Sequence, residues 1–228
     1  PGCVLFTQKL YLHGKLLVMW RKKLYLIVSL FWVGISYASG FIDVKSPDGT
    51  VALTVVHEEN FKLYYKVFYR GKEATGYSGM AIKLQSPAVV LDQFDLSGID
   101  SSVINETWKP VWGEVNTIRN NYKQLVIKLA DRSGSGIILH IIFRVFNDGL
   151  GFRYVFPQQK KLNHFIVADE LTQFRMTGDH KTFWIPGDYD TNEFMYNTTK
   201  LSEVDASSSA MSQEIYAKTF FDKNAVQT

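Results

Sequence analysis

Residues 122–156 carry the pattern that most limits what this chain can fold into. Apolar and polar residues alternate over 124–129, and an apolar run follows at 137–146. Asn147-Asp148-Gly149 ends that run with a hairpin turn signal, because Asn and Asp tolerate positive φ and Gly favours it. Apolar residues resume at 151–156. The sequence therefore predicts antiparallel strands here, with 137–146 buried on both faces.

Shorter strand patterns precede this hairpin. Residues 51–56 are rich in β-branched side chains and follow a Ser-Pro-Asp-Gly turn at 46–49. Apolar side chains share one face of 62–69, whereas 86–107 alternate less cleanly and contain turn residues. Several such segments at short spacing, with no long helical period, predict an all-β fold built as an antiparallel β-sandwich.

Three charged or titratable residues lie inside the apolar strands. Arg144 and Arg153 are expected to pair with acids such as Glu106 or Glu114, because an unpaired guanidinium in a core is costly. His140 is expected to be a hydrogen-bonded structural imidazole rather than a metal ligand.

The amino-terminal segment differs in charge from the rest. Five of the 25 basic residues lie in the first 40 positions, which contain no acid, so the remainder is slightly acidic. A body without a basic stripe argues against nucleic acid as a partner. Basic residues at 21–23 precede an apolar run at 24–33, and Ser36-Tyr37-Ala38 offers a signal-peptidase site. A membrane anchor is the alternative, but the run is shorter than the roughly 20 residues that a span needs.

These features predict the domain organisation. Residues 1–18 are expected to be a non-native upstream extension, and they contain the only cysteine, Cys3. Residues 19–38 are expected to be a signal peptide, which predicts a periplasmic protein with no membrane anchor after cleavage. Residues 39–228 are expected to form a β-sandwich domain that is incomplete at its carboxyl end. Neither disulfides nor thiolate chemistry is expected in the exported part.

An acidic motif follows the aromatic stretch 183–187. Asp188, Asp190, Asn192 and Glu193 come directly after a Pro-Gly pair, which is expected to turn the strand out into a loop. Carboxylate and amide oxygens are the ligands that a divalent cation such as Ca²⁺ prefers. A solvated acidic turn is the alternative.

Three tryptophans are candidates for sugar binding. Trp108 and Trp112 flank a proline, and Trp184 precedes the acidic motif. An aromatic face can take up the apolar face of a pyranose, so these side chains could form a stacking platform. The alternative is that they fill one end of the sandwich core.

Three blocks of sequence together resemble glycoside hydrolase family 97. They are 106–114 with 118–120 and Tyr122; 143–154 with 156–160; and 178–180 with 183–191 and Glu193. The resemblance runs from about residue 46 to 228 and is greatest to the periplasmic α-glucosidases of bacterial starch utilisation. It implies a large galactose-mutarotase-like supersandwich, truncated before a (β/α)₈ catalytic barrel.

The resemblance also implies the chemistry. In the family, barrel glutamates hold most of a Ca²⁺ ion at the active site, and one ligand comes from the sandwich. The matching residue here is Glu193. The resemblance implies an α-linked oligosaccharide as substrate and the missing barrel of the same protein as partner. Every catalytic carboxylate belongs to that barrel, so this chain alone is expected to be inactive and to bind Ca²⁺ negligibly.

Other readings stay open at this point. The family has an inverting α-glucosidase branch and a retaining α-galactosidase branch, and the residues that separate them lie beyond Thr228. A free-standing carbohydrate-binding sandwich that uses Trp108, Trp112 and Trp184 is the rival interpretation. A purely structural interaction domain is the third.

Overall fold

The computed structural model describes residues 40–188, 196–206 and 221–227, and side chains as far as 187 and at 196–206. Strands dominate this part of the chain, and its one helical element is the short 3₁₀ turn η1 (Leu201–Glu203). The strands pair antiparallel in four small sheets. No helix in the described ranges has the length and apolarity to cross a membrane.

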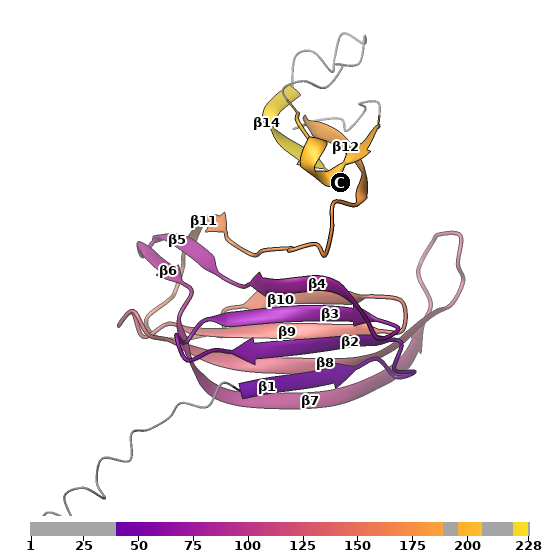
Figure 1. Ribbon diagram of the computed structural model, residues 1–228. Coiled ribbons are helices and arrows are strands. Elements are labelled where there is room, and N and C mark those ends of the chain that lie inside the picture. The colour runs from indigo at the N-terminus through magenta and orange to yellow at the C-terminus, as the bar shows by residue number, and fades with distance from the viewer. Residues whose placement is uncertain (1–39, 189–195, 207–220, 228) are drawn as a thin grey trace, which may run out of the picture. The chain divides into compact units, whose positions relative to one another are not determined.

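Two four-stranded sheets form the body of the fold (Figure 1). One has the order β1-β2-β3-β4 and the other the order β10-β9-β8-β7. Their bounds are β1 (Gly40–Lys45), β2 (Val51–His57), β3 (Leu63–Tyr69), β4 (Lys72–Gly79), β7 (Phe94–Trp108), β8 (Ile118–Asp131), β9 (Ile138–Phe146) and β10 (Leu150–Val155). The expected antiparallel β-sandwich is confirmed.

Two smaller sheets accompany the sandwich. The first has the order β11-β5-β6, and the second the order β13-β12-β14. Their strands are β5 (Ile82–Ser86), β6 (Val89–Leu91), β11 (Ile166–Glu170), β12 (Lys181–Asp188), β13 (Asn197–Lys200) and β14 (Phe221–Gln227).

The core lies between the two four-stranded sheets and follows the alternation of their strands. Successive inward side chains of β8 and β9 are almost fully buried, as are those of β2 and β3. They include Leu53, Val55, Leu63, Tyr65, Leu125, Ile127, Leu129, Leu139, Ile141, Phe143 and Val145. Burial of these side chains is the main favourable term holding the two layers together.

Two details of the strand predictions are wrong. Residues 86–107 were expected to contain several turns, yet β7 runs for 15 residues over Phe94–Trp108. Most of β7 is exposed on both faces, so it lacks the alternation that marks a covered strand. The second error concerns β9, which is buried on one face only; its other face is half-buried at His140, Ile142 and Arg144.

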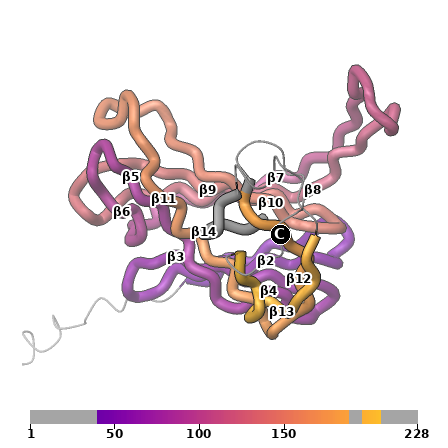
Figure 2. The backbone as a smooth tube through the Cα atoms, turned by 90° about the horizontal axis from the view of Figure 1, so that it is seen from above, coloured from indigo at the N-terminus to yellow at the C-terminus, as the bar shows by residue number. Residues whose placement is uncertain are grey.

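The two layers are offset by one strand. β2 packs on β9 and β1 packs on β8, so β7 extends past the first sheet, and the β7–β8 connection projects from the body (Figures 1 and 2). At the other edge of the first sheet, away from β1, residues 171–176 run along β4, and we call them the closing segment. Its backbone bonds are Leu171 N to Ala81 O (3.0 Å), Gln173 N to Gly79 O (2.9 Å) and Gly76 N to Arg175 O (2.7 Å).

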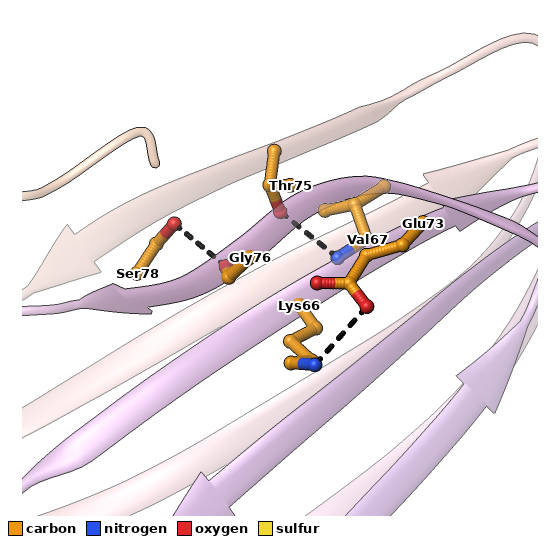
Figure 3. A network of polar contacts seen from close by, with 6 residues as sticks. All are labelled: Lys66, Val67, Glu73, Thr75, Gly76 and Ser78. Atoms are coloured by element: carbon orange, nitrogen blue, oxygen red, sulfur yellow. Dashed lines mark hydrogen bonds and ion pairs between the residues drawn. The ribbon is translucent and has the colours of Figure 1, made fainter. Parts of the chain in front are cut away.

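β4 is irregular where the closing segment meets it. Its register with β3 shifts on both sides of Val67, whose N–H donates to Thr75 Oγ1 at 3.0 Å in place of a ladder bond (Figure 3). The fully buried Ser78 hydroxyl donates to Gly76 O at 3.0 Å and accepts from Arg175 N at 2.9 Å. Side chains thus replace the backbone bonds that the bulge removes.

Candidate functional site

The acidic motif begins on β12, which does not turn out of its sheet at the Pro-Gly pair. β12 pairs with β13 over Lys181–Trp184 and with β14 from Ile185 to Asp188, with a register shift between Pro186 and Gly187. The expected turn is therefore wrong: Pro186 and Gly187 form an irregularity inside a strand. An irregularity of this kind tolerates proline, which has no backbone N–H to pair with the next strand. Pro186 and Gly187 are both buried.

The predicted Ca²⁺ ligand itself, Glu193, lies outside the described residues. So do Asp190, Asn192 and the side chain of Asp188. Among the side chains that are described, no three of His, Cys, Asp or Glu come together in a group that could hold a metal ion. A single ligand from this chain at Glu193, completed by carboxylates from elsewhere, therefore stays a prediction.

The segments on either side of this motif are well anchored. Trp184 Nε1 donates to Thr199 Oγ1 at 2.9 Å, joining β12 to β13 through their side chains. Asp179 accepts from the backbone N–H and the hydroxyl of Ser202, both at 2.9 Å, and the backbone bond is the main cause that lowers the pKa of Asp179. The polar, serine-rich composition of residues 197–213 predicts a mobile loop; over 197–203 this prediction is wrong, because these residues form β13 and η1, and 207–213 lie outside the described residues.

The three candidate tryptophans lie in different environments. Trp108, at the end of β7, is 46% exposed, and Trp112, in the β7–β8 connection, is 88% exposed. Trp184 is only 2% exposed, so it offers no open face for a sugar ring. The expectation of a core plug is wrong for Trp108 and Trp112, because they lie where β7 and β8 extend past the sandwich. A platform of all three is wrong as well.

The two arginines of the central hairpin lie on the outer face of the β9–β10 pair, where they line a shallow pocket. Ile142, Gly151 and Phe152 complete its lining. Arg144 Nε donates to Gln124 Oε1 at 3.2 Å, and the guanidinium stacks on the Tyr122 ring with 4.9 Å to its centroid. Sequence reasoning missed this pocket, although two arginines spaced around a hairpin turn were a signal for it.

Within the described residues, neither arginine forms the expected ion pair with Glu106 or Glu114. Glu106 instead accepts from Asn120 Nδ2 at 3.1 Å. The physical reason is location: the arginines face the solvent side of the sheet, so no buried charge needs neutralising.

His140 lies on the same outer face and is half-buried. Burial is the main cause that lowers its pKa, and the nearby Lys128 acts in the same direction. The hydrogen-bonded imidazole that was expected is not found, because within the described residues no hydrogen bond involves the His140 ring.

Comparison with known proteins gives one family. Residues 44–223 match the family described as Glycosyl-hydrolase 97 N-terminal, which covers all three sequence blocks that carry the resemblance.

Several solved structures share the fold. One is a glycoside hydrolase family 97 enzyme variant from Pseudoalteromonas sp. strain K8 in complex with panose, with 26% identity, a TM-score of 0.65, and 72% of this chain matched to 25% of that one. The same organism's enzyme in complex with acarbose matches with 26% identity over 69% and 24% of the two chains, with a TM-score of 0.63. A β-arabinopyranosidase matches with 25% identity over 66% and 23%, with a TM-score of 0.58. The chain thus spans about a quarter of the length of these relatives.

Proposed function

The chain belongs to the glycosyl hydrolase 97 N-terminal family, and from that premise we propose that it is the amino-terminal domain of a calcium-dependent, exo-acting α-glucosidase exported to the periplasm. The match over residues 44–223 carries this proposal. Panose and acarbose, the ligands of two relatives, are oligosaccharides with α-linked sugar units, which supports an α-linked oligosaccharide as substrate.

In this proposal the chain supplies scaffold and one metal ligand. Glycoside cleavage needs a general acid and a second carboxylate at a defined separation, and both would come from the catalytic barrel of the same protein. Glu193 would contribute one oxygen ligand, five residues after the end of β12 in the sequence. Bound Ca²⁺ would supply positive charge near the scissile bond. Since Ca²⁺ takes about six to eight oxygens, a lone carboxylate holds it weakly.

The test uses the full-length gene product and compares Glu193→Gln with Asp190→Asn. Asp190 is the control because it lies three residues before Glu193 in the sequence and the resemblance assigns it no contact with the ion. We expect Glu193→Gln to raise the Ca²⁺ concentration needed for half-maximal hydrolysis of maltooligosaccharides by about tenfold or more, by analogy with other ligand losses. Asp190→Asn should leave it within about twofold. Equal losses in both variants would contradict the assignment of Glu193.

Two further measurements sharpen the proposal. Calorimetric titration of the 228-residue chain with Ca²⁺ should show no tight binding, and stoichiometric binding would contradict a shared site. The likeness to a β-arabinopyranosidase gives a second substrate to assay. Faster hydrolysis of a β-arabinopyranoside than of an α-glucoside would change the proposed substrate but not the family.

The exposure of Trp108 and Trp112 favours one rival, a carbohydrate-binding sandwich without catalysis. Under that reading maltooligosaccharides would quench the fluorescence of the 228-residue chain, and Trp112→Ala would remove the quenching. We expect no quenching, because these two side chains lie on a projecting hairpin with apolar neighbours such as Val111 and Val115, both strongly exposed.

A further inference from the structure

The long strand β7 exposes core-facing side chains. Leu96 and Ile99 pair across the sheet with Leu129 and Ile127, which are both completely buried, so they point toward the inside of the sandwich. Leu96 is nevertheless 37% exposed and Ile99 is 44% exposed. Val103 lies further along the same face and is 67% exposed. We call these three residues the β7 strip.

The other face of β7 is polar, as a solvent-facing side should be. Gly98, Asp100 and Ser102 pair with Lys128, Val126 and Gln124 on the outer face of β8, and Asp100 forms an ion pair with Lys128 at 2.6 Å. Over residues 96–103 the core-facing side of β7 is therefore mostly apolar, with Ser101 as its polar exception, and the register shift between Leu96 and Gly98 hides this alternation in the sequence. In the described part of the chain β1, the last strand of the first sheet on this side, packs on β8 rather than centrally over β7.

β1 also has a free side. It pairs with β2 along one edge, and in the described part of the chain no strand pairs with its other edge. Its inward residues Ile42 and Val44 already belong to the core or pack against it. Strands in a sheet are about 4.8 Å apart, and β2 and β1 lie over β9 and β8. The next strand beyond β1 would therefore lie over β7.

We propose that the edge of β1 and the β7 strip together form the docking site for one further β-strand, supplied by the same polypeptide beyond Thr228. The inference rests on the proposed function, in which this chain continues into a longer enzyme. A strand with apolar residues at alternate positions would pair its backbone with β1 and cover Leu96, Ile99 and Val103 with its side chains.

The opposite edge of the sandwich supports this choice of occupant. There the closing segment comes from later in the chain, pairs with β4, and places Phe174 against Phe152 and Tyr65, with ring centroids 6.1 and 6.4 Å apart. The fold therefore already closes one edge with a returning segment that combines backbone bonds and an apolar side chain. The matched part of this chain covers only 25% and 24% of the two relatives, so they have ample further sequence for the second edge.

The experiment compares the 228-residue chain with the full-length gene product by hydrogen exchange. Alternate amides of β1 point to its free edge and should exchange rapidly in the 228-residue chain. In the full-length protein they should be protected by about 100-fold or more, since a docked strand must open before exchange. Equal exchange in both proteins would overturn the proposal.

Ile99→Lys adds a second readout, with Ser102→Lys on the polar face of β7 as its control. In the 228-residue chain both variants should melt within about 2 °C of the parent, as exposed substitutions do. In the full-length protein Ile99→Lys should lower Tm by about 4 °C or more, whereas Ser102→Lys should not. Neither measurement depends on hydrolytic activity, so a wrong substrate would not affect the result.

A second copy of the chain is the competing occupant. If the 228-residue chain forms a dimer whose β1 amides are protected and which Ile99→Lys dissociates, the β1 edge binds another copy and the proposal is overturned.

Discussion

The two edges of the sandwich differ in how their backbone groups are paired and their apolar side chains are covered. At the β4 edge the closing segment satisfies the backbone and covers the core. Two tyrosines hold it: Tyr65 Oη donates to Gln173 O at 2.8 Å, and Tyr154 Oη lies 2.6 Å from Thr172 Oγ1. At the β1 edge, the described residues provide no equivalent segment, and the β7 strip stays exposed.

The difference shows where stability resides in this chain. At the closed edge Tyr65 is buried and the hydroxyls of Tyr65 and Tyr154 are paired, although Phe174 of the closing segment stays 64% exposed. An open edge leaves apolar side chains partly in water, where they contribute little. Substitutions at the closed edge should therefore be costly in the 228-residue chain, and substitutions at the open edge should be nearly neutral.

The largest effect is expected at Tyr65, which is 2% exposed and touches the rings of Phe143, Phe152 and Phe174. Tyr65→Ala should lower the free energy of unfolding by about 3–5 kcal/mol, because it leaves a cavity and frees the carbonyl of Gln173. Urea denaturation of the 228-residue chain measures this. The control is Tyr69→Ala on the same strand, where the side chain is 47% exposed. A loss of less than about 1 kcal/mol at Tyr65 would mean that the edge is not closed in solution.

A smaller effect is expected from the ionisation of Tyr154. Burial raises its pKa to about 12. The unfolded chain then releases this proton near pH 10 and the folded chain near pH 12, so the stabilisation is fully present below about pH 10 and is lost as the pH rises through about 12. Between about pH 9 and pH 11 the loss should be about 1 kcal/mol.

Tyr154→Phe isolates this contribution, because Tyr65, whose pKa burial also raises, titrates in both proteins. The free energy of unfolding of the parent should fall more steeply with pH than that of the variant. Parallel profiles for the two proteins would show that Tyr154 is exposed to solvent and that its contact with Thr172 is absent in solution.

The contrast between the edges also explains what could be predicted from the sequence. Strands covered on one side, such as β8 and β9, show alternation of apolar and polar residues, and Asn147-Asp148-Gly149 indicates the hairpin turn after Phe146. The family followed from contiguous motifs. β7 was not predictable, because a strand with water on both faces of most residues has no periodic signal.

Side-chain environment was the other part that sequence could not supply. Trp108, Trp112 and Trp184 are chemically alike, and only the projection of the β7–β8 hairpin separates the exposed pair from the buried one. Arg144 was expected to need an acid, but an amide and an aromatic ring suffice at the half-buried surface. Glu193 lies outside the described residues, so its role rests on the family resemblance alone.

The smallest effect tests the open edge with one substitution made at two places. Val103 and Val145 lie in the same row of the sheet, since both pair with Lys123, yet Val103 is 67% exposed and Val145 is completely buried. Threonine keeps the branched shape and adds a hydroxyl. In the 228-residue chain Val103→Thr should change the free energy of unfolding by less than about 0.5 kcal/mol, as exposed substitutions do. Val145→Thr should cost about 1–3 kcal/mol, because its hydroxyl enters the core without a partner. Similar losses at both positions would show that the β7 strip is already covered in this chain, and the distinction between the two edges would fail.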